Sequence, residues 1–363
     1  MKLEELIADP VYQMNLCLWM LAPSAEAGVR PVLKEAGFQL RSIEPPLPMP
    51  LEIRNVLADN QIRISDPASP DLILHDGQRG FVMLECKASL FGSEPKGSDS
   101  PQRQARALLL QVPEILADAL AVDRNQIDTS HLVYLSRALP LDPGGSSQTA
   151  GLQEIADSLE SQELRVAPFG MLGLLIGDRK ISISGGYSPG SLPASMVAVI
   201  PDAGVAVQEL EPDTDPRPLY FIPWMPGSEN SRDSRGQEIF GNRVLQATAA
   251  RIGQCRPPAE LNLSLDDLLN EATWSSFERW RNKDAAKSLR KNARKLIGET
   301  FKSASSGADL TVEPGTYLLR MKIPDIDAKE RLLEAFRKWE STLWNQPNPQ
   351  GDLFDTPSED ENR

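Results

Sequence analysis

One short stretch, residues 70–87, constrains the fold more than any other part of this 363-residue sequence. Residues 70–75 (PDLILH) predict a strand, residues 76–80 (DGQRG) a turn, and residues 81–87 (FVMLECK) a second strand. The second strand begins with four consecutive apolar residues, which is typical of a strand buried on both faces. The stretch therefore predicts a β-hairpin whose second strand lies inside a domain.

Helices and strands alternate along the first 185 residues, which favours an α/β domain over residues 1–185. Helices are predicted over residues 11–21, 25–36, 101–122 (interrupted at Pro113) and 151–162. Further strands are predicted over residues 131–136 and 170–176, and a proline-rich extended connector over residues 44–51.

The remainder of the chain differs from this first part. Residues 186–344 predict a mainly helical α+β accessory domain with one strand at 316–322. Residues 345–363 are proline-rich and acidic and contain almost no core-forming residues, so we expect a disordered tail.

The composition excludes several kinds of site. The three cysteines form no CxxC pair, which argues against a thiolate zinc site and favours a reduced compartment. Two histidines are too few for a His-rich metal site, so chemistry is expected from Asp, Glu and Lys. No apolar stretch approaches the ~20 residues of a membrane helix. We therefore expect a soluble cytoplasmic protein that does not contact a membrane.

The hairpin brings two carboxylates and an amine together if Gln78 lies at its tip. Asp71 then faces Glu85, with Cβ atoms about 4.5–5.5 Å apart. Lys87 lies on the same face two residues further on, whereas Cys86 points into the core. A slip of one residue in the register would remove this alignment.

Such a set is suited to phosphodiester hydrolysis. Two adjacent carboxylates repel one another, and a divalent cation such as Mg²⁺ (or Mn²⁺) relieves that conflict. Water bound to the cation has a lowered pKa, and a lysine beside it orients or deprotonates that water or holds a phosphate oxygen.

Pro70-Asp71 and Glu85-Xaa-Lys87 resemble the PD-(D/E)XK nuclease superfamily, which has the restriction-endonuclease-like fold. The hairpin, the thirteen residues between Asp71 and Glu85, and the following helix fit the layout of that superfamily over about residues 25–180. The resemblance implies a mixed sheet flanked by helices, with Asp71 and Glu85 as metal ligands and Lys87 as the catalytic lysine.

The resemblance also implies two further residues that the sequence does not decide. A glutamate from an upstream helix would join the metal ligands, and Glu35 is the first choice and Glu26 the second. A polar residue from the downstream helix would line the site, and here Gln104 and Gln111 are preferred to Gln102.

A basic stripe interrupts the acidity of the chain, whose net charge is −13. Residues 279–302 carry nine basic and two acidic residues. Helical spacing places five of the basic residues on one stripe: Arg279, Lys283, Lys287, Arg290 and Arg294. A basic stripe on an acidic protein predicts contact with DNA phosphates, and the alternative is a solvated helix face neutralised by the protein's own acids.

The tail contains a short motif. Gln350-Gly351-Asp352-Leu353-Phe354 resembles the pentapeptide with which bacterial proteins bind the sliding clamp of the replication machinery. The match rests on Gln350, Leu353 and Phe354, which would present an apolar pair and a hydrogen-bonding amide to a pocket. The alternative is that the Leu-Phe pair folds back on the body.

These features predict a Mg²⁺-dependent DNA endonuclease in a bacterial cytoplasm. Antiviral defence or replication-coupled repair follows only by analogy with the superfamily, and a partner ATPase or helicase and an oligomer remain open. One alternative is a non-catalytic adaptor that keeps the fold and recruits a clamp or an ATPase. Another is that Asp71, Glu85 and Lys87 form only the solvated end of a strand.

Overall fold

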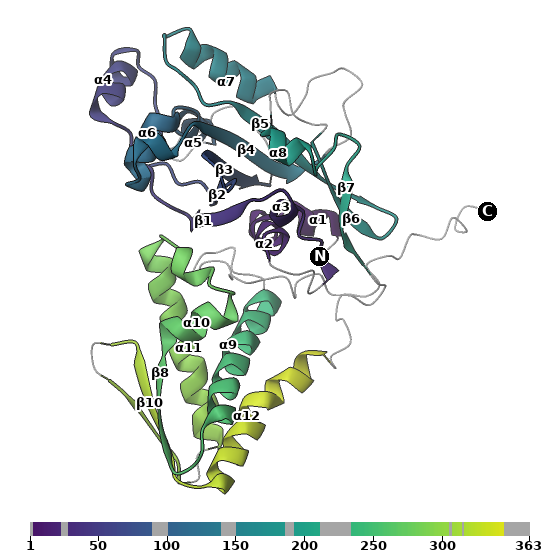
Figure 1. The fold of residues 1–363 in the computed structure, drawn as a ribbon, viewed down its shortest axis with the longest axis vertical. Coiled ribbons are helices and arrows are strands. Elements are labelled where there is room, and N and C mark those ends of the chain that lie inside the picture. The colour runs from purple at the N-terminus through teal and green to yellow at the C-terminus, as the bar shows by residue number, and fades with distance from the viewer. Residues whose placement is uncertain are drawn as a thin grey trace, which may run out of the picture. The chain divides into compact units, whose positions relative to one another are not determined.

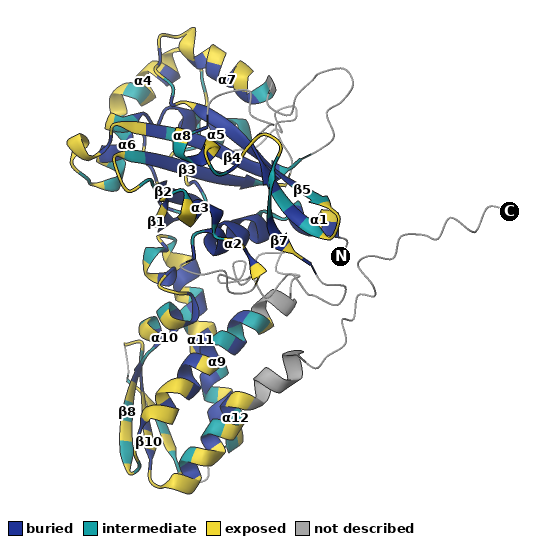
Figure 2. Ribbon diagram, turned by 45° about the vertical axis from the view of Figure 1, so that its right-hand side comes forward, coloured by how far each residue is buried: buried dark blue, intermediate teal, exposed yellow. Residues whose placement is uncertain are grey.

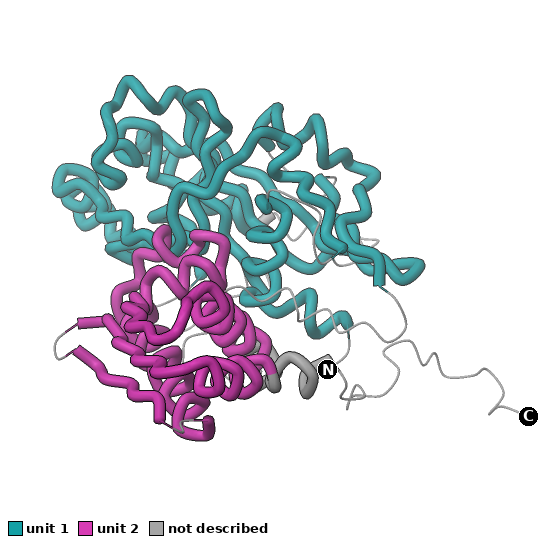
Figure 3. The backbone as a smooth tube through the Cα atoms, turned by 60° about the horizontal axis from the view of Figure 1, so that its bottom comes forward, with its two compact units in different colours: residues 1–214 teal, residues 215–363 magenta. Residues whose placement is uncertain are grey.

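The computed structural model describes residues 3–22, 28–88, 101–138, 150–185, 192–210, 234–304, 307–313 and 316–344. The chain divides into two compact units, Met1–Thr214 and Asp215–Arg363, which Figure 3 shows in two colours. The boundary expected at residue 185 falls inside the first unit. The reason is that a strand at Val205–Glu209 pairs with the strand at Lys180–Ser184 and belongs to the same sheet.

A seven-stranded sheet forms the centre of the first unit, with its strands in sequence order. The strands are β1 (Gln39–Ile43), β2 (Leu72–His75), β3 (Gly80–Lys87), β4 (Thr129–Arg137), β5 (Phe169–Gly177), β6 (Lys180–Ser184) and β7 (Val205–Glu209). The sheet is mixed, because β3, β4 and β5 are parallel to one another and the other neighbours are antiparallel. The four strands predicted over the first 176 residues are confirmed, whereas β1 was not predicted.

Helices cover both faces of this sheet (Figure 1). They are α1 (Leu3–Ile7), α2 (Pro10–Met20), α3 (Val32–Glu35), α4 (Leu51–Asp59), α5 (Pro101–Leu109), α6 (Pro113–Leu120), α7 (Ala150–Glu160) and α8 (Ala194–Val197). α1 and α2 pack on one face, and α5, α6 and α7 cover the other. The helices predicted near residues 11–21, 101–122 and 151–162 are confirmed, including the interruption before Pro113.

The helix predicted over residues 25–36 is wrong in most of its described part, because only the four residues of α3 are α-helical. Val29 forms an isolated bridge with Gln208, and the N–H of Arg30 donates to the carbonyl of Val207. Pro31 also disfavours a helical conformation for the residue that precedes it. The chain is therefore extended before α3 begins.

The β2–β3 hairpin has the predicted register. Leu72 pairs with Leu84, and His75 pairs with Phe81, so continuing the ladder places Asp71 opposite Glu85. The turn is fixed by Asp76, whose Oδ1 accepts hydrogen bonds from the N–H groups of Gln78 (2.8 Å) and Gly80 (2.9 Å).

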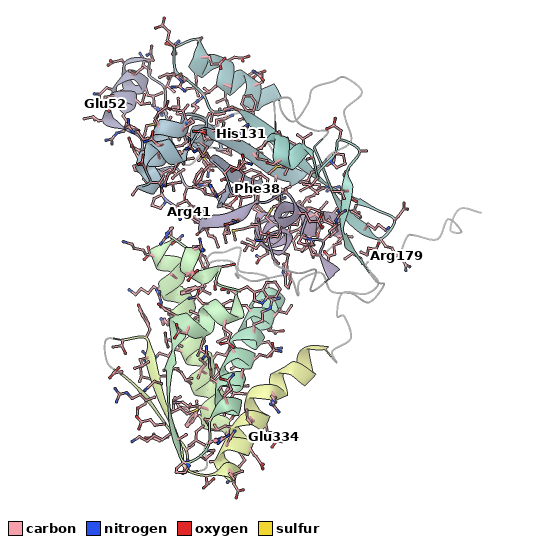
Figure 4. The ribbon with its side chains drawn as sticks, in the orientation of Figure 1. Phe38, Arg41, Glu52, His131, Arg179 and Glu334 are labelled. Carbon is pink, nitrogen blue, oxygen red and sulfur yellow. The ribbon has the colours of Figure 1, made fainter. Side chains whose placement is uncertain are left out.

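Both faces of the hairpin are buried, as the apolar run predicts (Figure 2). Ile73 and Met83 belong to the core that α5 and α7 cover. Leu84 and its neighbours of the same parity point to the opposite face, against which α2 packs. At the other end of the sheet, Asp178 and Arg179 both have positive φ and form the two-residue turn between β5 and β6; Figure 4 shows Arg179 at this tip.

The second unit is mainly helical with a small antiparallel sheet in the order β8–β10–β9. Its elements are α9 (Ser234–Gln254), β8 (Ala259–Ser264), α10 (Leu265–Ala272), α11 (Lys283–Ala304), β9 (Asp309–Val312), β10 (Leu318–Ile323) and α12 (Ile326–Trp344). The predicted strand at 316–322 corresponds to β10, whereas β8 and β9 were not predicted. Within the described ranges, no helix is long and apolar enough to cross a membrane.

Candidate active site

Asp71, Glu85 and Lys87 lie together at the C-terminal end of β3. The Lys87 ammonium pairs with Glu85, with 2.7 Å between Nζ and Oε1. The N–H of Asp71 donates to the other carboxylate oxygen of Glu85 (3.3 Å), and Asp71 Oδ2 accepts a hydrogen bond from the N–H of Cys86 (2.6 Å). The hairpin register thus positions two carboxylates and one ammonium in a connected set.

Burial shapes the charges of these groups. The side chain of Glu85 is only 3% exposed and that of Lys87 is 20% exposed. Loss of water raises the pKa of Asp71 well above its ordinary value, and the neighbouring Glu85 carboxylate raises it further. Burial also raises the pKa of Glu85, although the Lys87 charge opposes this.

Lys87 remains charged in this setting. Burial by itself would lower the pKa of Lys87, but the Glu85 carboxylate and its hydrogen bond outweigh that effect and raise it. An ammonium with a raised pKa holds its proton at neutral pH. Lys87 is therefore suited to donate hydrogen bonds and positive charge to a phosphate rather than to accept a proton.

Gln104, predicted to line the site, lies against Lys87. Its Oε1 accepts a hydrogen bond from Lys87 Nζ (2.9 Å), and its Nε2 donates to the carbonyl of Ser69 (3.1 Å). The alternative Gln111 lies beyond the end of α5 and is buried beside Ser130 of β4, whose hydroxyl donates to its carbonyl. Gln104 is thus the downstream residue that the structure brings to Lys87.

Glu35, expected as the upstream metal ligand, is held elsewhere. Both of its carboxylate oxygens accept hydrogen bonds from Arg30, and the side chain is 38% exposed. The expectation required a helix over residues 25–36, and α3 includes only its last turn. The structure therefore does not bring Glu35 to Asp71. Its alternative, Glu26, lies outside the described residues.

Glu44 is an upstream acid near Asp71 that the sequence reasoning missed. It follows β1, and its N–H donates to the carbonyl of Asp71 (2.9 Å). Its carboxylate contributes to the raised pKa of Asp71. The sequence signal that could have located Glu44 is the strand at residues 39–43, but its alternation is interrupted by a bulge between Leu40 and Ser42.

The backbone behind the site is anchored by α2. Gln13 is fully buried, and its Nε2 donates to the carbonyls of Lys87 (3.1 Å) and Ile7 (2.8 Å). Cys86 points away from the carboxylates and interacts with Cys17 of α2. Burial raises the pKa of the Cys86 thiol well above its ordinary value, so this residue is part of the core rather than a nucleophile.

The donor set of the site fits a hard divalent cation with few protein ligands. In the part of the chain that the structure describes, no three Asp, Glu, His or Cys side chains are gathered to hold a metal ion by themselves. Asp71 and Glu85 supply carboxylate oxygens from two adjacent strands. Mg²⁺ often takes one or two carboxylates and completes its coordination with water and substrate phosphate.

The predicted basic stripe is only partly present on α11. Arg279 is wrong as a member, because it ends a 3-10 turn at Phe277–Arg279 and the chain is extended at Trp280 before α11 begins. Arg290 is taken up by a two-hydrogen-bond ion pair with Asp266 (2.6 and 3.0 Å). Lys283, Lys287 and Arg294 are exposed on the helix, as expected.

Gln350, Leu353 and Phe354, the residues predicted to bind a clamp, lie outside the described residues. Comparison of the chain with protein-family models, with curated proteins and with solved structures finds no match. The interpretation of the site therefore rests on its own geometry.

Proposed function

We propose that this chain is a metal-dependent DNA endonuclease, a phosphodiester hydrolase whose site is Asp71, Glu85 and Lys87. The observation that carries the proposal is the convergence of these three groups at the end of a strand that is buried on both faces. Keeping two carboxylates in a region of low water content costs free energy that a purely structural hairpin does not need. Catalysis with a cation supplies a reason for that cost.

Asp71 and Glu85 are the residues that would hold Mg²⁺ or Mn²⁺. Glu44, which is hydrogen-bonded to Asp71 through the backbone, replaces Glu35 as the nearby upstream acid in this proposal, without forming a three-carboxylate metal set with Asp71 and Glu85. When bound, the ion supplies a water of lowered pKa and neutralises charge on the phosphate. The pKa values of Asp71 and Glu85 are raised by burial, so both carboxylates are better accommodated beside a cation than alone.

Lys87 and Gln104 orient the substrate in this proposal. The charged ammonium of Lys87 donates to a non-bridging phosphate oxygen and stabilises the negative charge that develops there. Gln104 is a positioning residue, because its side chain connects Lys87 Nζ to the backbone of Ser69. The ammonium is thereby kept beside the carboxylates.

The arrangement of elements in the first unit supports the proposed resemblance to the PD-(D/E)XK superfamily in more detail than the α/β class alone. The antiparallel hairpin carries the acidic pair, and α5 follows β3 and contributes Gln104. β4 then returns parallel to β3 in a mixed sheet that helices cover. We propose the restriction-endonuclease-like fold for this unit on that layout.

The proposed substrate is DNA, because exposed lysines on α11 add a basic surface to an acidic chain. The tail motif is the basis for proposing a sliding clamp as a partner. The resemblance to the superfamily is the basis for proposing an ATPase or helicase partner and a role in defence or repair. A cytoplasmic location is proposed from the reduced cysteines.

Cleavage of DNA under defined metal conditions tests the proposal. Purified full-length protein is incubated with plasmid and with linear DNA in Mg²⁺, Mn²⁺ or EDTA, beside Asp71→Ala and Lys87→Ala. Glu35→Gln is the matched control, because it removes an upstream carboxylate whose exposed ion pair contributes little to stability.

The expected result is cleavage that requires metal, persists in Glu35→Gln and disappears in the two site variants. Loss of cleavage in Glu44→Gln would identify the upstream acid. The absence of cleavage under every condition, or full cleavage by Asp71→Ala, would contradict the proposal. The first of these results would favour the non-catalytic adaptor.

A further inference from the structure

The second unit has an arrangement of elements that the basic stripe alone does not reveal. A long helix, α9, is followed by β8, then by two consecutive helices, α10 and α11, and then by the β9–β10 hairpin. β10 lies between β8 and β9, so the hairpin that follows α11 is joined to the strand that precedes α10. This order of elements, with the 3-10 turn Phe277–Arg279 between α10 and α11, resembles that of a helix-turn-helix unit with a β-hairpin after its second helix.

The connection between α10 and α11 is ordered by its own hydrogen bonds. Trp274 and Ser275 have positive φ and turn the chain. The side-chain oxygens of Thr273 and Asn270 accept hydrogen bonds from the N–H groups of Phe277 and Glu278. This connection is longer than the three or four residues of most helix-turn-helix units.

One side of α11 is buried in the unit and the other is exposed. The buried residues are Ala285, Ala286, Leu289, Ala293, Ile297, Thr300 and Phe301. The exposed side carries six basic residues: Lys283, Lys287, Lys291, Arg294, Lys295 and Lys302. Only two acidic residues, Asp284 and Glu299, share it. This helix face is therefore positive on a chain whose net charge is −13.

Arg290 of α11 contacts both α10 and the β9–β10 hairpin. Its guanidinium pairs with Asp266 in the first turn of α10 and lies 5.0 Å from the ring centre of Phe277. It also lies 4.7 Å from the ring centre of Tyr317, whose carbonyl accepts a hydrogen bond from the N–H of Leu265. A basic residue of the predicted stripe thus fixes the position of the other basic residues.

We propose that the second unit binds duplex DNA by placing the exposed face of α11 in the major groove, with the β9–β10 hairpin against the neighbouring backbone. The major groove is about 12 Å wide and admits one α-helix, and the second helix of a helix-turn-helix unit binds there. Lys287 and Lys291 occupy the exposed face of the first half of α11 and contact phosphates and base edges. Lys322 is exposed on β10 and supplies positive charge to the hairpin, whereas Arg320 pairs with Glu313 of the same hairpin.

This inference rests on the proposed function only in its choice of DNA as the ligand, and it commits to the duplex form. Double-stranded RNA has a deep and narrow major groove that excludes a helix. Single strands present no groove. A surface that binds by charge alone would not distinguish these three ligands at equal phosphate content.

Binding measured without cleavage tests the inference. Fluorescence anisotropy of the full-length protein in EDTA is recorded with a DNA duplex, its single strand and the matching RNA duplex over a series of salt concentrations. The test variant is Lys287→Ala with Lys291→Ala. The matched control, Arg79→Ala with Arg124→Ala, removes the same charge from two exposed ion pairs of the first unit.

The expected result is that the DNA duplex binds more tightly than either other ligand. The test variant is expected to lower the slope of log K against log salt by about two, because each phosphate contact contributes about 0.9. The control keeps the wild-type slope. Equal binding of the three ligands, or a test variant that behaves as the control, would overturn the inference. Cleavage without this binding pattern contradicts only the inference, and this binding pattern without cleavage contradicts only the proposed function.

Discussion

The carboxyl group of Asp71 lowers the stability of the folded protein at neutral pH. Its pKa is raised because the site excludes water and because Glu85 adds a second negative charge nearby. The N–H of Cys86 and the charge of Lys87 oppose this effect. Functional sites commonly retain such unfavourable groups, which a stability-driven core would replace.

Replacing Asp71 with Asn is therefore expected to stabilise the protein at neutral pH. Because the pKa of Asp71 is higher in the folded than in the unfolded protein, the group contributes stability at pH values below the ordinary carboxyl pKa of 3.8. This contribution is lost as pH rises through the raised pKa of the folded protein. In EDTA, the Tm of Asp71→Asn should exceed that of the wild type at pH 8, by a margin that shrinks toward pH 4. A variant less stable than the wild type at pH 8 would contradict this explanation.

Lys87 has the opposite effect on stability. Lys87→Met leaves Glu85 buried without its cation, and removal of one partner of a buried pair costs about 3–5 kcal/mol. Urea unfolding measures this loss of stability. Hydrogen exchange of the β3 and β4 amides measures it independently. Adding Glu85→Gln to Lys87→Met should restore most of the stability. If the double variant is no more stable than Lys87→Met, Glu85 is not the partner that matters.

At the scale of elements, periodicity and turn residues predicted the hairpin that carries the site. The apolar run at Phe81 and the Asp-Gly turn fix the register, which brings Glu85 opposite Asp71. Helix α5 was predictable from the Ser-Pro sequence at its start. The sequence therefore contained the core of the candidate site.

Other elements depend on contacts that a sequence pattern does not reveal. β1 is short and bulged, so its alternation is weak, and Glu44 was missed with it. The extended chain before α3 depends on pairing with β7, about 180 residues away in the sequence. On α11, spacing alone did not show that the chain leaves the helical path at Trp280.

Two glycines test the packing of the second unit. Gly298 lies inside α11, and an added Cβ would meet nothing within 4 Å, so Gly298→Ala should stabilise the helix by about 0.5–1 kcal/mol. Hydrogen exchange of the α11 amides should slow by about two- to fivefold. Gly241→Ala should gain less, because its Cβ would lie 3.0 Å from Leu296 Cδ2. Equal gains at both positions would contradict close packing of α9 on α11.

At the scale of the whole molecule, the proposed catalytic site and the proposed DNA-binding surface belong to different units. The first unit contains the acidic site, and the second contains the positive face of α11. The net charge of −13 conceals this separation, because it averages over both units and the acidic end of the chain. The division at residue 214 was not predictable from composition, since the pairing of β7 with β6 decides it.

The tail motif gives a prediction that is separate from catalysis. Leu353→Ala with Phe354→Ala is expected to abolish capture of the full-length protein by an immobilised bacterial sliding clamp, because it removes both apolar anchors. The rate of DNA cleavage in the absence of the clamp should be unchanged. Capture that survives both substitutions would contradict binding of the clamp through this motif.

Asp71 belongs to the proposed metal-dependent hydrolytic site, and the rate of plasmid cleavage by Asp71→Asn measures whether it does. Because this variant is expected to be at least as stable as the wild type, a loss of activity would not reflect unfolding. In Mg²⁺ at neutral pH, the initial rate is expected to fall by about a hundredfold or more. A rate within a few-fold of the wild type would contradict the claim.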